Sequence, residues 1–277
     1  MNDLERIRAA LEAAVHAILP FVHGAVSVEL KSEGQGPVTE ADRASNRALR
    51  EVLLQDGEGW LSEESVDDLE RLRKNRVWVV DPLDGTLEFS VGIPEWCVSV
   101  ALIENGRAIA GGICNPATSE VFLGSLRTGL TYNDEPARPT ERNRLSGAVV
   151  VASRSEVKRG EWMPFENLPF SIRPMGSVAY KLALLAAGRV DATWTLTPKN
   201  EWDVAAGVAL IESAGGLVRS LAGSALRFNI RNTLLPGLVA SGPSRQQEIV
   251  SLLSAHIPES PLRTDASLRQ PYEGSTI

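Results

Sequence analysis

The sequence predicts an α+β protein, in which a run of antiparallel strands and a set of packed helices take the place of a doubly wound βαβ repeat. Three strand candidates follow one another between residues 97 and 123, and short turn signals separate them. A helix with an apolar stripe precedes this run, and strands alternate with helices after residue 144. No Walker-A or dinucleotide-binding glycine pattern is present, and the glycine-rich stretches are turn-like.

Composition limits the kinds of partner. The chain has 277 residues, of which 43% are hydrophobic and 23% charged, and no apolar run is long enough to cross a bilayer. Its amino terminus, M-N-D-L-E-R-I-R, has no apolar segment of the kind found in secretory signals, so we expect a cytoplasmic protein without a membrane partner. A formal charge of −7 opposes binding to a nucleic-acid polymer, whereas a small phosphorylated metabolite fits if a cation is bound.

Two helices are expected before the first long strand. In residues 4–19 apolar side chains recur every three or four positions, and Pro20 ends the pattern. A second helix is expected over residues 40–54, with Thr39 as its N-cap and Asp42 at the third position of a capping box. Asp42 either serves the helix start alone or also acts as a base or orienting group, if the fold brings it to a catalytic site.

The motif V-W-V-V-D-P-L-D-G-T, residues 77–86, organises the rest of the chain. Its apolar first half is typical of a buried strand, and the pairing is expected to end at Asp81 because Pro82 lacks an N–H and the following glycine favours a turn. The turn would bring Asp81, Asp84 and the Leu83 carbonyl together. Neighbouring carboxylates repel unless a proton or cation separates them, and Mg²⁺ prefers oxygen ligands. The alternative is an ordinary loop, since Asp-Pro and Asp-Gly pairs are common in turns.

An acidic pair precedes this motif. Glu63 and Glu64 follow Trp60-Leu61-Ser62, so a short strand ending at Glu63 is expected beside the strand that carries Asp81. Glu63 would then reach Asp81 and Asp84. In an ordinary solvated loop, the two glutamates would have no such role.

The central strands lead to a boundary between two halves. Strands are expected over residues 97–103, 107–113 and 120–123, and the Glu104-Asn105-Gly106 turn joins the first two as a hairpin. The polar, proline-containing stretch 133–144 is the best candidate for a boundary. We therefore expect an N-terminal α+β half over residues 1–140 and a C-terminal α/β half over residues 141–277.

The second half is expected to alternate strands and helices. Strands are expected over residues 148–152, 190–194 and 238–240, and helices over 176–187, over 204–213 and from about 244. Asp203 stands at the start of the second of these helices, which Gly215-Gly216 closes. On its position alone, Asp203 is a capping residue.

Three separated motifs together resemble a known family. D-P-L-D-G-T at residues 81–86, E-E-S at 63–65 and W-D-V-A-A-G at 202–207 closely resemble the inositol monophosphatase family of Mg²⁺-dependent, lithium-sensitive phosphatases. The resemblance spans residues 37–216. It implies a five-layer αβαβα sandwich, usually a homodimer, that hydrolyses phosphate monoesters with Mg²⁺ as cofactor.

The resemblance also implies roles for residues at matching positions. The implied metal ligands are the side chains of Glu63, Asp81, Asp84 and Asp203 and the carbonyl of Leu83. The implied catalytic residues are Asp42, Glu63 and Thr86, of which Asp42 and Thr86 would align and activate the attacking water. The implied substrate-binding residues are Asp84, Gly85, Thr86, Gly176, Ser177, Lys181 and Asp203, with Gly85 and Thr86 as the phosphate cradle. Lys31 stands where the family often has a lysine.

The substrate branch rests on fewer positions. D-G-T-L-E-F resembles the D-G-T-x-E-F of the 3′(2′),5′-bisphosphate nucleotidase branch, and Lys181 and the stretch 150–155 lean the same way. Leu196 stands where an inositol enzyme tends to carry a glutamate for sugar hydroxyls, although Glu201 could substitute for it. We therefore expect a bisphosphate nucleotide, with its second phosphate held by Lys181, Arg154 or Lys199 unless these are ordinary surface charges. Two alternatives stay open: an inositol-1-phosphate phosphatase, and a metal-dependent phospho-metabolite binding protein without turnover.

Overall fold

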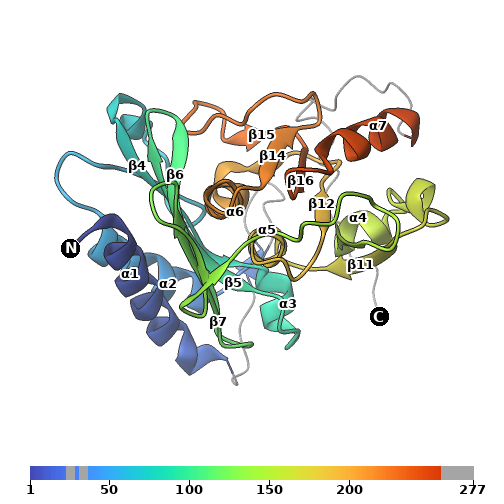
Figure 1. Ribbon diagram of the computed structural model, residues 1–277. Coiled ribbons are helices and arrows are strands. Elements are labelled where there is room, and N and C mark those ends of the chain that lie inside the picture. Colours follow the sequence, from blue (N-terminus) through green and yellow to red (C-terminus); the bar gives the residue numbers. More distant parts are fainter. Residues whose placement is uncertain (23–28, 31–36, 257–277) are drawn as a thin grey trace.

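The computed structural model describes residues 1–22, 29–30 and 37–256. Five layers stack in the order helices, sheet, helices, sheet, helices (Figure 1). The predicted α+β class and five-layer sandwich are therefore confirmed. Lys31 lies outside the described residues. In the part of the chain that is described, no helix combines the length and the apolar character that a membrane span needs.

A seven-stranded sheet forms the second layer. Its strand order is β3-β4-β5-β6-β7-β8-β9, and all neighbours are antiparallel except the parallel pair β3 and β4. The strands are β3 (Gly59–Ser62), β4 (Arg76–Asp84), β5 (Cys97–Glu104), β6 (Arg107–Asn115), β7 (Glu120–Ser125), β8 (Gly129–Tyr132) and β9 (Glu135–Ala137). The predicted meander is confirmed, and β8 and β9 extend it beyond the prediction.

A five-stranded mixed sheet forms the fourth layer, in the order β11-β10-β12-β16-β14. Its strands are β10 (Val149–Ser153), β11 (Ser171–Met175), β12 (Ala192–Trp194), β14 (Leu217–Ser220) and β16 (Leu238–Ser241). Of these, β11 and β14 were not predicted. Two short pairs complete the strands: β1 (Glu29–Leu30) with β2 (Pro37–Val38), and β13 (Lys199–Asn200) with β15 (Leu234–Leu235).

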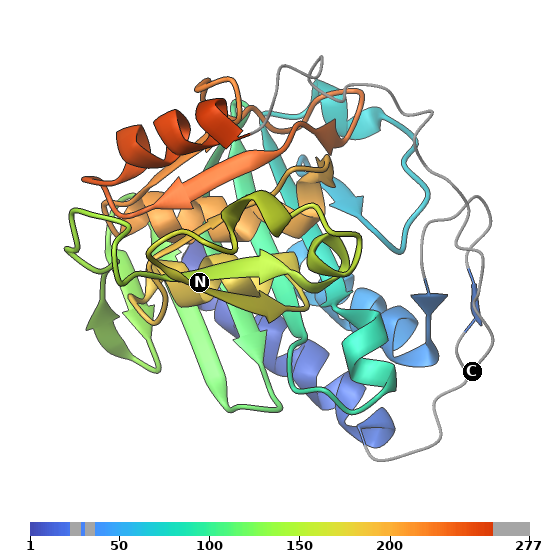
Figure 2. The ribbon, with the colours of Figure 1, turned by 90° about the vertical axis from the view of Figure 1, so that its right-hand side faces the viewer.

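Helices cover the outer faces of both sheets and fill the space between them. The outer layers contain α1 (Asp3–Ile18) and α2 (Glu40–Leu53) on one side, and α4 (Arg154–Lys158) and α7 (Gln246–His256) on the other. The middle layer is α5 (Val178–Ala186) and α6 (Glu201–Ser213), and α3 (Thr86–Ser90) follows β4. Figure 2 shows the strands of the second sheet in front of α5 and α6 and the large sheet behind them.

Buried apolar clusters fill the spaces between the layers, one under each outer helix layer and one around the middle helices α5 and α6. Trp78 and Val80 pack with α1 and α2, whereas Val77 and Val79 pack with α5 and α6 in the middle layer. Because side chains alternate faces along a strand, Asp81 follows the Val77 and Val79 series and faces the middle layer. The alternation of β4 therefore brings this carboxylate to the side of the sheet on which α6 lies.

The division near residue 140 stays a prediction. It falls between the last strand of the large sheet, β9, and the first strand of the second sheet, β10. Both sheets contribute to the middle core with α5 and α6, which come from the second half. The two halves therefore share a layer.

Candidate metal centre

A bulge at the end of β4 shapes the acidic site. Asp81 pairs with Ser99 and Asp84 pairs with Cys97, and the register shifts between the two pairs. The expectation that pairing ends at Asp81 is therefore wrong, because the strand absorbs Pro82 in a bulge, where a missing ladder donor is tolerated. The Leu83 N–H donates to Asp81 Oδ1 at 3.0 Å, so the bulge holds the Asp81 carboxylate in place.

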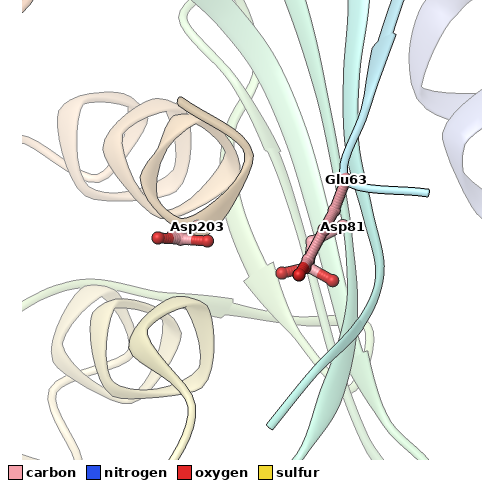
Figure 3. A group of neighbouring side chains, drawn as sticks. All are labelled: Glu63, Asp81 and Asp203. Carbon is pink, nitrogen blue, oxygen red and sulfur yellow. The ribbon is translucent and has the colours of Figure 1, made fainter. Parts of the chain in front are cut away.

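Three carboxylates from two sides of the molecule meet at this point. Glu63 follows β3, Asp81 lies on β4, and Asp203 lies in the first turn of α6. Each contributes one oxygen to a group in which all the oxygens lie within 4.8 Å of one another. Figure 3 shows Asp203 at the end of α6 facing Glu63 and Asp81. The expected meeting of Glu63 with Asp81 across neighbouring strands is thus present, and Asp203 comes to it from the other half.

The electrostatics of this group favour a bound cation. Burial, and then the negative charges of Glu63 and Asp84, raise the pKa of Asp81 well above its usual range. Burial and the same two neighbouring charges raise the pKa of Asp203 to about 8. Burial and mutual repulsion therefore oppose ionisation of these carboxylates, and a bound cation would offset both effects. An all-oxygen set of carboxylates is the donor chemistry of Mg²⁺ and similar hard cations, so the residues fit such an ion.

Asp84 lies beside this group and is tied to α5. Its Oδ2 accepts hydrogen bonds from the Ser177 hydroxyl at 2.7 Å and from the Ala179 N–H at 2.6 Å. Burial raises the pKa of Asp84, while these two hydrogen bonds and the charge of Lys181 oppose the rise. The charge of Asp84 in turn acts on Asp81 and Asp203. Its role as a metal ligand stays a prediction, as does that of the Leu83 carbonyl.

Asp42 caps the second helix and also contacts Thr86, while its role as a base or orienting group stays a prediction. Its Oδ2 accepts from the N–H and the hydroxyl of Thr39 at 2.8 and 2.6 Å, which completes the predicted capping box. Its Oδ1 faces the Thr86 hydroxyl at 3.1 Å, and that hydroxyl also lies 3.1 Å from the Leu83 carbonyl oxygen. Capping the helix and reaching the end of β4 are therefore compatible.

Asp203 repeats this arrangement on α6. Its Oδ2 accepts from the Asn200 N–H at 2.9 Å in a second capping box, and it also takes part in the acidic group. In both helices an aspartate at the third position caps the helix with one oxygen. The capping interpretation of Asp203 was right but incomplete.

Two glycines of the predicted substrate-binding set lie in close contact with the rest of the protein, Gly85 against backbone and Gly176 against a side chain. Gly85 has φ 97°, and a Cβ there would lie 2.8 Å from the Glu95 carbonyl oxygen. A Cβ on Gly176 would lie 2.3 Å from Cδ of Glu88, and the Gly176 N–H donates to Glu95 Oε2 at 2.8 Å. The Gly176 amide is therefore engaged by the protein itself. Its role in substrate binding stays a prediction.

Glu95 was missed by the sequence analysis. Besides the Gly176 N–H, its carboxylate binds the Arg154 guanidinium, which also lies 3.5 Å from Glu88. Glu95 is 59 positions from Arg154 and 81 positions from Gly176 in the sequence. The sequence around Glu95 therefore does not predict these contacts. They also offset the charge of Arg154, which was expected to be available for a second phosphate.

Lys181 and Lys199 differ in their access to the site. Lys181 is buried, and its Nζ donates to the carbonyls of Met175 and Gly176, each at 3.3 Å. Burial, and then the charge of Lys199, lower the pKa of Lys181 to about 8. Lys199 keeps 15% of its side chain exposed and donates to the Thr197 hydroxyl at 3.0 Å. Lys181 is thus no ordinary surface lysine, and Lys199 is the more accessible cation.

Glu201 does not replace the acceptor missing at Leu196. Its side chain is fully buried, and its two oxygens accept from the N–H groups of Asn229 and Ile230 at 2.7 and 3.0 Å. The hypothesis that Glu201 substitutes for a sugar-binding glutamate is therefore wrong. Leu196 packs against the apolar cluster that also contains Trp194.

The sequence and the fold are both similar to those of known proteins. The model of the inositol monophosphatase family matches residues 3–258. The chain is 37% identical to an inositol-1-monophosphatase of Rhizobium meliloti over 188 residues, which cover 65% of this chain and 70% of that protein. It is 32% identical to a fructose-1,6-bisphosphatase/inositol-1-monophosphatase of Thermotoga maritima, over 71% of this chain and 76% of the relative. A solved structure of a Thermotoga maritima IMPase superposes with a TM-score of 0.80 at 27% identity, covering 93% of this chain and 98% of the other.

Proposed function

This chain belongs to the inositol monophosphatase family, and from that premise we propose that the acidic group of Glu63, Asp81 and Asp203 is the metal centre of its phosphomonoesterase activity. The chain is a metal-dependent phosphatase that hydrolyses a small phosphorylated molecule. The meeting of three carboxylate oxygens within 4.8 Å, contributed by two halves of the chain, is the observation that carries the proposal.

The metal we propose is Mg²⁺. Its ligands are the side chains of Glu63, Asp81, Asp84 and Asp203 and the carbonyl of Leu83. When bound, the cation supplies Lewis acidity that activates water and offsets negative charge on the leaving oxygen. Without a cation, the clustered carboxylates repel an anionic substrate, so the metal is a requirement for binding as well as for turnover.

Asp42 and Thr86 then align the attacking water. The Thr86 hydroxyl donates to Asp42 Oδ1, so its oxygen lone pairs remain as acceptors for a proton of water. Two hydrogen bonds from Thr39 hold the Asp42 carboxylate, and Asp42 in turn orients the Thr86 hydroxyl. Gly85 and the first N–H groups of α3 contribute donors for the phosphate. Glu63, beside Asp81, is the third proposed catalytic residue, together with Asp42 and Thr86.

For the substrate we propose a 3′(2′),5′-bisphosphate nucleotide, with inositol 1-phosphate as the second candidate. Lys199 supports the first, because its charge acts on Asp84 and Asp203 and its side chain retains exposure. It lies 3.8 Å from the buried Glu156, which limits its freedom. The relatives named as inositol-1-monophosphatases support the second candidate. Arg154 supports neither, since Glu88 and Glu95 already neutralise it.

A substrate panel separates the two candidates. With saturating Mg²⁺ we expect a higher kcat/KM for 3′-phosphoadenosine 5′-phosphate than for inositol 1-phosphate. Lys199→Met should lower the first value by about tenfold, as expected for a lost charge-assisted contact of about 1.5 kcal/mol, and leave the second nearly unchanged. Lys158→Met, an exposed lysine on α4, is the matched control. Equal or better turnover of inositol 1-phosphate would favour the second candidate.

The same panel tests the binding-protein alternative. Folded, Mg²⁺-loaded protein that releases no phosphate from any phosphomonoester would support binding without turnover. A homodimer and a cytoplasmic location stay predictions. Light scattering during size-exclusion chromatography measures the first, and a mass near twice the 29.9 kDa of the chain is expected.

A further inference from the structure

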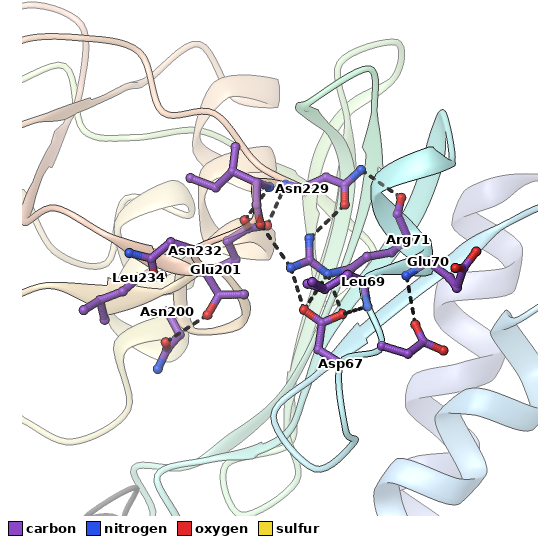
Figure 4. A network of polar contacts seen from close by, with 12 residues as sticks. Asp67, Leu69, Glu70, Arg71, Asn200, Glu201, Asn229, Asn232 and Leu234 are labelled. Carbon is purple, nitrogen blue, oxygen red and sulfur yellow. Dashed lines mark hydrogen bonds and ion pairs between the residues drawn. The ribbon is translucent and has the colours of Figure 1, made fainter.

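A polar network around two buried side chains, Arg71 and Glu201, joins the loop after β3 to the first turn of α6. We call it the Arg71 network, after the arginine at its centre. Its members are Asp67, Arg71, Glu201, Asn229 and Ile230, and Figure 4 shows Arg71 between Asp67 and Asn229. Arg71 is 2% exposed and donates to Asp67 from Nε at 3.1 Å and from Nη2 at 2.8 Å. It also donates from Nη1 to Asn229 Oδ1 at 2.9 Å and from Nη2 to the Ile230 carbonyl at 3.0 Å. One side chain thus connects two segments that are 158 residues apart in the sequence.

Glu201 completes the network from the other side. Asn229 returns a hydrogen bond from its Nδ2 to the Arg71 carbonyl at 3.1 Å. The N–H groups of Asn229 and Ile230 donate to the two carboxylate oxygens of Glu201. A buried charge is stable only when it is hydrogen-bonded, and here each carboxylate oxygen of Glu201 has a donor. Hydrogen bonds therefore connect Arg71 to Glu201 at the start of α6, through residues 229 and 230.

The network ties together the two sides of the acidic group. Asp67 lies four residues after Glu63, and Glu201 is the first residue of α6, two residues before Asp203. Glu63 and Asp203 carry like charges and repel each other, so their proximity needs support from elsewhere. The Arg71 network holds both chain segments: Arg71 donates to Asp67 on one side, and the N–H groups of Asn229 and Ile230 donate to Glu201 on the other.

We propose that Arg71 and Glu201 are positioning residues that fix Asp203 against Glu63 and so set the affinity of the site for its divalent cation. The inference rests on the proposed metal centre. A network that only stabilised the fold would change the midpoint of unfolding and leave metal affinity alone. A positioning network changes the metal affinity, and its effect on turnover disappears when the metal is saturating.

Glu201→Gln tests this most cleanly. The amide keeps the shape of the carboxylate but can accept at only one of its two positions, so one backbone N–H loses its partner. Isothermal titration with MgCl₂ alone should show an affinity about tenfold weaker, at the lower end of what outer-shell changes cause. At saturating Mg²⁺, kcat and the KM for the phosphomonoester should stay within about twofold of wild type. The matched control is Glu212→Gln on the same helix, where the carboxylate pairs with Arg107 at 3.2 Å. It should change neither the Mg²⁺ affinity nor the turnover.

A second variant keeps the test decisive if Glu201→Gln fails to fold. Asn229 has φ 57°, so Asn229→Gly removes the side chain that contacts Arg71 without backbone strain. It too should weaken Mg²⁺ binding. Lower stability with unchanged Mg²⁺ affinity in the folded variants would overturn the inference. If wild-type protein itself neither binds Mg²⁺ nor releases phosphate, the proposed function fails instead.

Discussion

At Asp84, one substitution removes the negative charge of the side chain while keeping its shape. Asp84→Asn keeps the side-chain volume and an oxygen for the donors of Ser177 and Ala179, but it removes the negative charge. We expect kcat with Mg²⁺ to fall by about 100-fold or more, because a metal ligand loses its charge. The midpoint of thermal unfolding of the metal-free protein should not fall, since a buried charge with raised pKa is removed.

The matched control for this change is Asp68→Asn. Asp68 is exposed, and its Oδ1 also accepts a backbone N–H, that of Glu70 at 3.0 Å. It should retain wild-type activity. If Asp84→Asn also retained most of its activity, Asp84 would only shape the turn, as the loop interpretation of the motif holds.

Asp203 makes the stability of the metal-free protein depend on pH. Burial and the neighbouring charges raise its pKa from 3.8 to about 8, so between these values the folded state holds a proton that the unfolded state has released. The free energy of unfolding contributed by this group is therefore present at low pH and lost as pH rises towards 8. Bound Mg²⁺ replaces the proton, so its stabilising effect should grow over the same range.

Thermal unfolding with EDTA and with Mg²⁺, at several pH values between 5 and 8, measures this effect. The difference between the two midpoints should widen as pH rises. In the metal-free Asp203→Asn variant the decline with pH should be shallower than in wild type. A difference that stays constant over the whole range would contradict the assignment of this proton to Asp203.

At the scale of elements, the turn from β4 into α3 depends on Gly85. Gly85 and Gly92 both have positive φ, 97° and 74°, but only Gly85 has backbone within 3 Å of the position that a Cβ would take. Gly92→Ala should cost about 1 kcal/mol for the left-handed conformation alone. Gly85→Ala should cost about 2–4 kcal/mol, because the Glu95 carbonyl must also move.

Urea denaturation of the two variants compares these costs directly. Equal losses would show that the turn accommodates a methyl group, and that Glu95 is not held closely against Gly85. The comparison also bears on Arg154, because Glu95 is its partner.

The same scale shows what local sequence signals can and cannot predict. Thr39, Asp42 and the acidic strand end at Asp81 follow from short-range rules, so the capping box and the grouping of carboxylates could be expected. The bulge at Pro82 could not, because proline also predicts the end of a ladder. Position at a helix start does not distinguish an aspartate that only caps the helix from one, such as Asp203, that also meets Glu63 and Asp81; the resemblance of the W-D-V-A-A-G motif to the family was the signal for this second contact.

At the scale of the whole molecule, periodicity predicted the longer helices α1, α2, α5, α6 and α7 and the first three strands of the central meander, but not the short helices α3 and α4. It missed β11 and β14, the two edge strands of the five-stranded sheet, whose S-I-R-P-M and L-V-R-S sequences each carry an arginine. Such strands are defined by their neighbours rather than by their own pattern. The long-range pairs, Arg71 with Asn229 and Glu95 with Arg154, could not be predicted for the same reason.

The most direct test of the metal centre is phosphate release during Mg²⁺ titration of metal-stripped protein. Inositol 1-phosphate and 3′-phosphoadenosine 5′-phosphate are both supplied, so that the choice of substrate does not decide the outcome. We predict no release after EDTA treatment, saturable recovery as Mg²⁺ is added, and no recovery in Asp81→Asn. Release that persists without metal, or folded Mg²⁺-loaded protein that releases nothing, would contradict a catalytic role for the carboxylates of Glu63, Asp81 and Asp203.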